Sequence, residues 1–155
     1  MVALRQRICG VDYDSHRITL VVINKKWQYQ KIIEIVASEK EFSERFEELT
    51  NSLFDSSEVL DLTNNVKFII EDSIYTRNPR ATLDLAQIKG MLITFCLNNG
   101  IKYQIMPARS WKKIVLKNGG VKKEEVAEFI LKKHPELKKR TQHVFDAYCI
   151  AISGN

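Results

Sequence analysis

The chain has 155 residues, of which 45% are hydrophobic and 28% are charged, a composition typical of a globular protein. Its apolar windows are too short to span a bilayer and its start lacks a signal-peptide core, so we expect an intracellular, cytoplasmic protein with no membrane partner. The three cysteines, Cys9, Cys96 and Cys149, are far apart in apolar contexts. This pattern favours reduced core residues over a disulfide framework or a zinc site.

The formal net charge of +5 is unevenly distributed along the chain. Residues 1–100 carry 12 basic and 14 acidic side chains, whereas residues 101–155 carry 12 basic and 5 acidic ones. The basic excess favours a polyanionic partner such as DNA, because each Lys or Arg placed on a phosphate releases a counterion. A solvated lysine-rich surface explains the charge alone equally well.

Apolar, β-capable runs predict four strands in the first half of the chain. The first strand ends near Asp12, and the others occupy residues 16–25, 29–36 and 66–72, with a hairpin turn at residues 24–28. The segment SEKE at residues 38–41 matches a capping box, which predicts an amphipathic helix to about Leu53. Residues 55–65 predict a loop that can hold one helical turn.

The second half of the chain predicts one strand and four helices. Asn78 as N-cap and Pro79 at the first helical position predict a helix to Asn99, where Gly100 stops it. The strand is expected at residues 102–106, and the other helices at residues 108–117, at residues 122–133 and after Thr141 as N-cap. This order of elements indicates one mixed α/β domain over residues 1–155.

Two acidic residues stand at the ends of predicted strands. Asp12 ends the first strand and Glu71 ends the buried run FIIE, and functional groups in open α/β sheets gather beyond the carboxyl ends of strands. A strand-end Asp is more often a turn residue. A buried strand, however, seldom ends in Glu unless the charge is paired or metal-bound.

A second pair of polar residues lies on the final, otherwise apolar helix. His143 and Asp146 are three residues apart, so both side chains project from one face near the helix start. Taken singly, His143 fits a half-buried histidine and Asp146 a carboxylate favoured by the helix dipole. Together with Asp12 and Glu71 they form a set of hard oxygens with one imidazole, which suits Mg²⁺ or Mn²⁺.

Four segments, in this order, resemble RuvC-type Holliday-junction resolvases. ICGVDYDSHRITLVVI resembles the family's opening strand with its Gly-Ile-Asp-x-Gly-Ser motif, and FIIEDSIYTRNPRATLDLAQIKGML resembles its strand ending in Glu and the helix that follows. IMPARSWKKIVLKNGGVKKEEV resembles its basic stretch, and HVFDAYCIAI its final helix with acidic residues three apart. The resemblance implies an RNase H-like α/β fold, a mixed five-stranded sheet flanked by helices, with the first three strands antiparallel and the others parallel.

The resemblance also implies the residues of the site. The catalytic metals, two Mg²⁺ ions for which Mn²⁺ substitutes, are expected on Asp12, Glu71, His143 and Asp146. Because Asp12 is central to the three segments that supply these residues, we expect it to be the bridging ligand. Basic residues serving the DNA are expected at Arg109, Lys112, Lys113 and Lys123. Tyr75 and Trp111 are candidates for stacking on opened bases, although Trp111 fits the core equally well.

Three positions depart from the family pattern. His143 stands where Asp is common, which predicts weaker metal binding and readier acceptance of Mn²⁺, or a general-base role. Asp14 replaces the motif's glycine, and the sequence assigns no role to this extra carboxylate. Ile74 stands near the usual stacking aromatic, which puts the family's cleavage-sequence preference in doubt.

The implied function is metal-dependent resolution of four-way DNA junctions by paired symmetric nicks. Two nicks need two active sites, so we expect a homodimer built on the helix at residues 78–99, with branched DNA as partner and no small-molecule substrate. Gly90 in that helix fits close packing, or is simply a tolerated glycine. The alternatives are a less specific RNase H-like nuclease acting on flaps, forks or RNA–DNA hybrids, and a junction-binding protein that never cuts. A third alternative, a fragment of an actin-like ATPase, is disfavoured because such proteins need a second phosphate loop and a longer chain.

Overall fold

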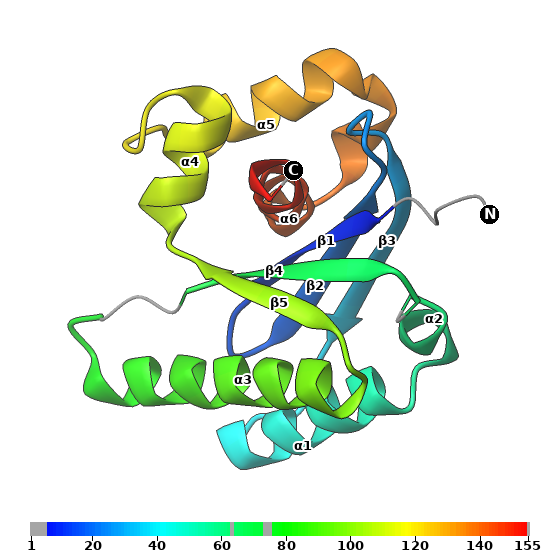
Figure 1. Ribbon diagram of the computed structural model, residues 1–155. Helices are drawn as coiled ribbons and strands as arrows, with labels where there is room; N and C mark the ends of the chain where they lie inside the picture. The colour runs from blue at the N-terminus through cyan, green and yellow to red at the C-terminus, as the bar shows by residue number, and fades with distance from the viewer. Residues whose placement is uncertain (1–5, 63, 73–75, 155) are drawn as a thin grey trace.

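A mixed five-stranded sheet forms the centre of the molecule (Figure 1), and the computed structural model describes residues 6–62, 64–72 and 76–154. The strands are β1 (Arg7–Tyr13), β2 (Arg17–Ile23), β3 (Tyr29–Val36), β4 (Val66–Glu71) and β5 (Lys102–Met106). Their order is β3-β2-β1-β4-β5. The first three are antiparallel, and β4 and β5 add in parallel. The predicted fold class and sheet are therefore confirmed.

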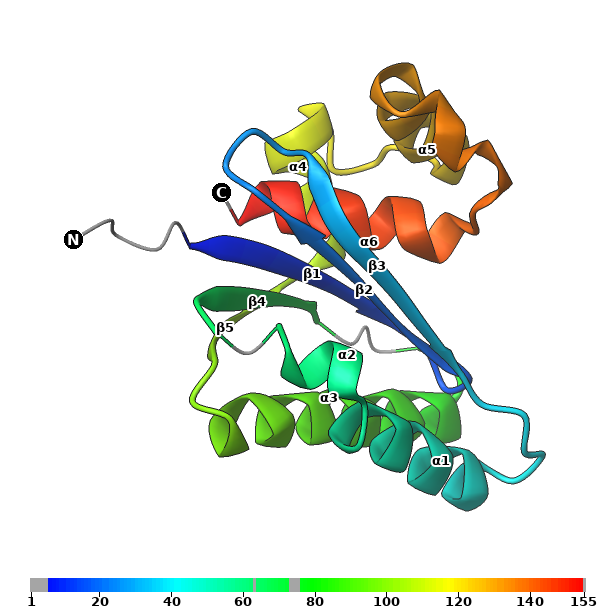
Figure 2. The same cartoon turned by 90° about the vertical axis from the view of Figure 1, so that its right-hand side faces the viewer.

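Helices cover both faces of this sheet (Figure 2). They are α1 (Phe42–Phe54), α2 (Ser57–Leu60), α3 (Pro79–Asn98), α4 (Ala108–Leu116), α5 (Lys123–Lys133) and α6 (Gln142–Ser153), with a 3₁₀ turn, η1, at Pro135–Lys139. Helices α1, α2 and α3 lie on one side, and α4, α5 and α6 on the other, so alternate residues of β1 enter two separate hydrophobic cores. Within the described residues no helix has both the length and the apolarity needed to cross a membrane.

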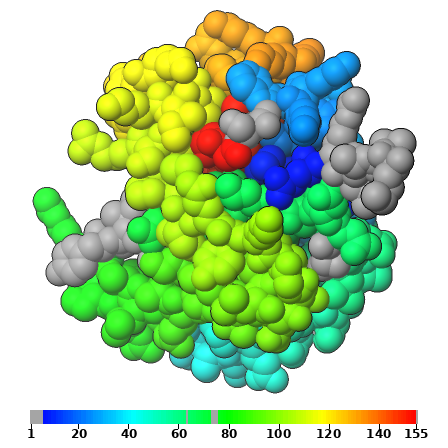
Figure 3. All heavy atoms as spheres, in the orientation of Figure 1, coloured from blue at the N-terminus to red at the C-terminus, as the bar shows by residue number. Residues whose placement is uncertain are grey.

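Helix α6 packs directly on β1, because Gly10 has no side chain there. A Cβ atom at Gly10 would stand 1.9 Å from the carbonyl oxygen of Ala147 and 2.5 Å from the amide nitrogen of Ala151. At the other end, a Cβ at Gly154 would stand 2.4 Å from Cγ1 of Ile69. Figure 3 shows the red C-terminal end of α6 at the surface, between the yellow atoms of α4 and the blue atoms of the first strands. The glycine contact fixes the height of α6 above the sheet, and with it the position of the helix's first turn.

Two predicted helix caps are wrong in detail. Helix α1 begins at Phe42 without a side-chain cap, and the capping box does not form. The backbone N–H of Ser38 instead donates to Glu48 Oε2 at 3.0 Å, so a carboxylate ten positions further along takes the place of Glu41. Thr141 does stand at the N-cap position of α6, but its hydroxyl donates to Glu34 Oε1 at 3.1 Å.

The three cysteines are free and buried, as predicted. Burial raises the pKa of the Cys9 and Cys149 thiols above their ordinary value, and raises that of Cys96 to about 12. Thiolate is the reactive form of cysteine. The cysteines therefore serve as small apolar core residues.

Candidate active site

The two strand-end acids meet at one edge of the sheet. Strands β1 and β4 are parallel neighbours, with Val11 beside Ile70. Asp12 and Glu71 follow these two residues, so their side chains emerge next to each other. Asp12 is only 5% exposed. The structure thus confirms that the sheet brings these two predicted site residues together.

Helix α6 brings His143 to the same edge. His143 Nδ1 lies 2.7 Å from Asp12 Oδ2, and since an ionised carboxylate only accepts, the ring nitrogen donates. Burial raises the pKa of Asp12, while the hydrogen bond from His143 opposes that shift. The same hydrogen bond raises the pKa of His143, so the imidazole keeps its proton more readily beside Asp12.

Glu71 is held by a tryptophan that the sequence left undecided. Trp111 Nε1 donates to Glu71 Oε2 at 2.7 Å, and Trp111 is 1% exposed in the core beneath α4. The stacking role considered for Trp111 is therefore wrong, because its ring faces are buried. Burial and the nearby charge of Asp12 raise the pKa of Glu71 to about 7, and the Trp111 hydrogen bond lowers it in part.

Asp146 completes the acidic set from the first turns of α6. Gln142 Nε2 donates to Asp146 Oδ1 at 3.0 Å. Burial raises the pKa of Asp146 to about 6, and the charge of Asp12 adds to this shift against the Gln142 hydrogen bond. The carboxylates of Asp12, Glu71 and Asp146 thus destabilise one another's charges, and each accepts a hydrogen bond from a different neighbour.

The donor set fits a divalent cation, although its members do not yet converge on one point. Within residues 6–62, 64–72 and 76–154, no three His, Cys, Asp or Glu side chains are close enough together to hold a metal ion. The carboxylates raise one another's pKa through charge repulsion, and a bound cation would offset that repulsion. Beside them, Thr19 of β2 stands opposite Asp12 of β1 in the sheet. Its Oγ1 is buried without a hydrogen-bond partner among the described residues, as expected for a polar group whose partner is a bound ion or water.

Comparison with known proteins now decides the family. The family model of the crossover junction endodeoxyribonuclease RuvC matches residues 8–154. This chain belongs to the RuvC family. A RuvC of Sulfurovum sp. (strain NBC37-1) is 30% identical over 152 residues, which cover 94% of this chain and 92% of the relative. RuvC of Chloroherpeton thalassium (strain ATCC 35110 / GB-78) is 31% identical over 88 residues, which cover 56% of this chain and 47% of the relative.

A solved structure supports the same fold. This chain is similar to T. thermophilus RuvC in complex with Holliday junction substrate, with a TM-score of 0.78 and 19% identity over 96% of this chain and 92% of the other. The likeness confirms the RuvC architecture of sheet and helices. RuvC nucleases are metal-dependent, in agreement with the chemistry of the donor set described above.

The basic residues predicted to serve DNA in this RuvC chain lie on α4 and α5. Lys112 is half-buried, and its charge lowers the pKa of both Glu71 and Asp146. Arg109 and Lys113 are exposed on the same helix, and Lys123 is the exposed first residue of α5. The structure thus brings Lys112 to the acidic set. Tyr75 and Ile74 lie outside the described residues.

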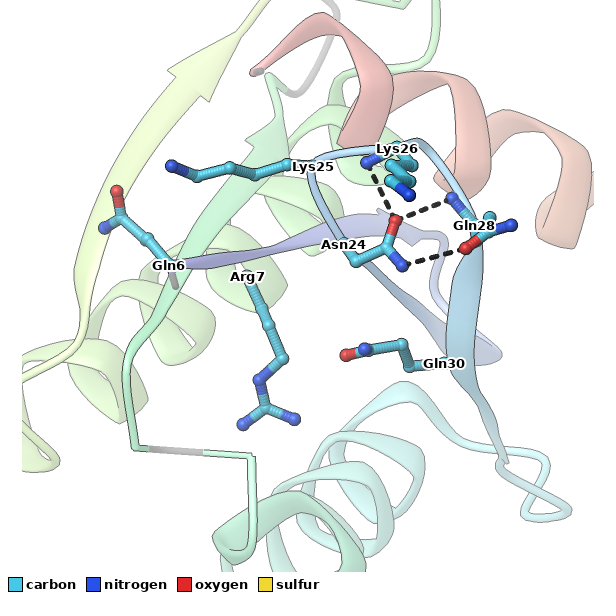
Figure 4. Close-up of a pocket in the computed structure, with 7 residues that line it drawn as sticks. All are labelled: Gln6, Arg7, Asn24, Lys25, Lys26, Gln28 and Gln30. Atoms are coloured by element: carbon cyan, nitrogen blue, oxygen red, sulfur yellow. Dashed lines mark hydrogen bonds between the residues drawn. The ribbon is translucent and has the colours of Figure 1, made fainter. Parts of the chain in front are cut away.

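A polar hollow of about 340 Å³ lies at the opposite end of β1 from Asp12 (Figure 4). It is lined by Gln6, Arg7, Asn24, Lys25, Lys26, Gln28 and Gln30. Asn24 organises the β2–β3 hairpin there, since its Oδ1 accepts from the backbone N–H groups of Lys26 at 2.9 Å and Gln28 at 3.1 Å. None of the described residues that line this hollow is acidic, and it lies apart from the acidic set.

The shifted carboxyl groups predict how stability depends on pH without metal. The folded pKa values of Glu71 and Asp146, about 7 and about 6, exceed the ordinary values of 4.5 and 3.8. The folded chain therefore binds extra protons in this window, and its free energy of unfolding falls as the pH rises from about 5 to about 7. The raised pKa values of Asp12 and His143 act in the same direction.

Thermal unfolding in EDTA tests this expectation with Glu71→Gln, which keeps an oxygen for Trp111 but removes the charge. Relative to this variant, the wild type is expected to lose about 3–6 °C in melting temperature between about pH 5 and about pH 8. Millimolar Mg²⁺ should remove this pH-dependent difference in melting temperature. If the difference in melting temperature between wild type and Glu71→Gln does not change with pH, the charged Glu71 carboxylate does not destabilise the folded chain.

Proposed function

We propose that this RuvC-family chain resolves four-way DNA junctions by paired hydrolytic nicks. The observation that carries the proposal is the presence of three carboxylates, a histidine and Lys112 at the same edge of the sheet. Phosphodiester cleavage needs clustered negative ligands for cations, with positive charge nearby for the DNA backbone. Both are present within the part of the chain that matches the RuvC family.

We propose that Asp12, Glu71, His143 and Asp146 hold two Mg²⁺ ions, for which Mn²⁺ substitutes. Such ions, when bound, activate a water for in-line attack and stabilise the leaving 3′ oxygen. Asp12, centrally placed between the other two carboxylates and His143, would serve as a ligand for both ions. Trp111 and Gln142 orient Glu71 and Asp146 through their hydrogen bonds, which leaves the second oxygen of each carboxylate for ligation.

The exposed face of α4 supplies the DNA contacts of this proposal. The charge of Lys112 lowers the pKa of both Glu71 and Asp146, so we assign it to the phosphate at the scissile position. Arg109, Lys113 and Lys123 would hold the flanking backbone through their exposed side chains, and Tyr75 is the candidate for stacking on an opened base.

A homodimer provides the second active site. Helix α3 carries Leu83, Gly90 and Leu97 at seven-residue spacing, so the three share one face. Leu83 is 63% exposed and Leu97 is 65% exposed. A Cβ at Gly90 would meet nothing within 4 Å in the described part of this chain. Two exposed leucines around a glycine suit close packing against the α3 helix of a second copy.

Incubation with a synthetic four-way junction and a matched linear duplex tests the function. In Mg²⁺ or Mn²⁺, we expect paired, symmetric nicks in the junction strands, none in the duplex and none in EDTA. Sedimentation of the protein alone should give a dimer. Unpaired cuts, or equal cutting of flaps and RNA–DNA hybrids, would favour a less specific nuclease. Metal-independent binding without any cut would identify a junction-binding protein instead. We propose that this activity resides in one domain and acts in the cytoplasm.

A further inference from the structure

Asp14 stands in the turn between β1 and β2, two residues beyond Asp12. Its Oδ1 accepts from the backbone N–H of His16 at 2.7 Å and from that of Arg17 at 3.0 Å. Its own N–H donates to the carbonyl of Arg17 at 3.0 Å. One carboxylate oxygen is thus engaged in building the turn, which leaves the other, Oδ2, to face outward from it.

The turn itself is braced from two further elements. The backbone N–H of Ala37 donates to the carbonyl of His16 at 2.8 Å. Arg45 of α1 is only 8% exposed, and its Nε donates to the carbonyl of Ser15 at 2.8 Å. A loop with this many anchors holds a fixed shape, so the direction of the Asp14 carboxylate is set by the fold.

That direction leads to the outer nitrogen of His143. Asp14 Oδ2 lies 3.7 Å from His143 Nε2, while Nδ1 of the same ring lies 2.7 Å from Asp12. The imidazole is therefore placed between two carboxylates, with one ring nitrogen directed to each. The distance to Asp14 is that of an ion pair and exceeds a hydrogen bond, and 41% of the Asp14 side chain is exposed.

We propose that Asp14 is a positioning residue that acts through His143. A histidine that binds a metal through one nitrogen typically donates the N–H of its other nitrogen to a carboxylate, which fixes the tautomer and the ring plane. Here Nδ1 points to Asp12, the central carboxylate of the proposed site, and Nε2 points to Asp14. Without metal, Nδ1 donates its proton to Asp12. A cation bound at Asp12 would replace that proton, and the carboxylate of Asp14 would then hold the remaining proton on Nε2, which leaves the lone pair of Nδ1 for the cation.

This assignment rests on the proposed function, because it names how one of the proposed ligands is oriented. It also gives a role to a carboxylate that is absent from the motif of the RuvC family. One substitution can remove the charge of Asp14 while keeping its hydrogen bonds in the turn. Asp14→Asn retains the Oδ1 acceptor for His16 and Arg17 and removes the negative oxygen that faces His143.

The experiment measures Mn²⁺ affinity by electron paramagnetic resonance without DNA, in wild type, Asp14→Asn, His143→Ala and the double variant. Asp14→Asn is expected to weaken the affinity about tenfold in the wild-type background, and to have no further effect beside His143→Ala. In Mg²⁺-saturated protein, the ¹⁵N resonances of His143 should report the Nε2–H tautomer in wild type and a mixture in Asp14→Asn. Asp55→Asn, an exposed carboxylate at the end of α1, is the matched control and should change neither readout.

Two outcomes would overturn the proposal. If Asp14→Asn weakens Mn²⁺ binding equally with and without His143, Asp14 acts only as a diffuse charge. If it changes neither affinity nor tautomer, Asp14 is only a turn residue. Melting temperatures measured in EDTA show whether each variant is folded. If Asp14→Asn unfolds, Asp14→Ser replaces it, because serine keeps a hydrogen-bond acceptor in the turn without charge. Both readouts need no DNA, so a chain that binds Mn²⁺ but never cuts junctions refutes the proposed function and leaves this test intact.

Discussion

Replacement of Asp146 by Asn is expected to abolish junction nicking, with a loss of at least about 10³-fold, while junction binding survives. The Asn side chain has the same shape and retains an oxygen for the Gln142 hydrogen bond. It removes one of three carboxylates whose combined charge is needed to hold cations at the edge of the sheet. The DNA-binding charges on α4 are untouched, so the binding surface remains.

The measurement pairs a nicking assay on a labelled four-way junction in Mg²⁺ with a binding assay in Ca²⁺ or EDTA. Asp61→Asn, an exposed carboxylate at the end of α2, makes the same chemical change away from the site and should behave as wild type. The metal-free Asp146→Asn protein should also melt at a slightly higher temperature, because a buried, repelled charge has gone. Full nicking by this variant would remove Asp146 from the site.

Substitution of Gly10 by Ala is expected to have the largest effect on stability, about 3 kcal/mol or more of unfolding free energy. The added methyl would stand 1.9 Å from the Ala147 carbonyl oxygen. Backbone cannot yield as a flexible side chain does, so α6 must lift away from β1. The helix carries His143 and Asp146, and the site is expected to lose its geometry together with the stability.

Thermal and urea unfolding would measure this change, with a drop in melting temperature of roughly 10 °C. Gly120→Ala is the matched control within the same chain, because among the described residues its Cβ would meet only Asn118 Oδ1, at an ordinary contact distance of 3.4 Å. In this exposed turn the added methyl should leave the melting temperature nearly unchanged. An unchanged melting temperature for Gly10→Ala would mean that α6 does not rest on β1 as described.

The sheet and the ends of its strands were predictable from sequence because they follow from local patterns. Apolar runs of five to eight residues located β1 to β5, and a Glu at the end of a buried run marked Glu71 as a residue that needs a partner. The three-residue spacing of His143 and Asp146 predicted their common face. These signals depend only on neighbours in the chain.

The partners that hold the site were not predictable in the same way. Trp111 and Glu71 are 40 positions apart, and nothing in either segment indicates that an indole will reach that carboxylate rather than stack on a base. The failed capping box at Ser38 has the same cause, since Glu48 lies ten positions further along. The role of Gly10 also depends on a helix that begins more than a hundred residues later.

The hydrogen bond between Asp12 and His143 joins two residues that are 131 positions apart in the chain. The active site can therefore be completed only late in synthesis. A ribosome makes β1 early and α6 last among the described elements, so a growing chain holds Asp12 and Glu71 but lacks the helix that completes the site. Contacts this distant in sequence also form late in folding. The chain should therefore remain unable to cut DNA until α6 has been translated, and products truncated before α6 should be harmless to nearby nucleic acid.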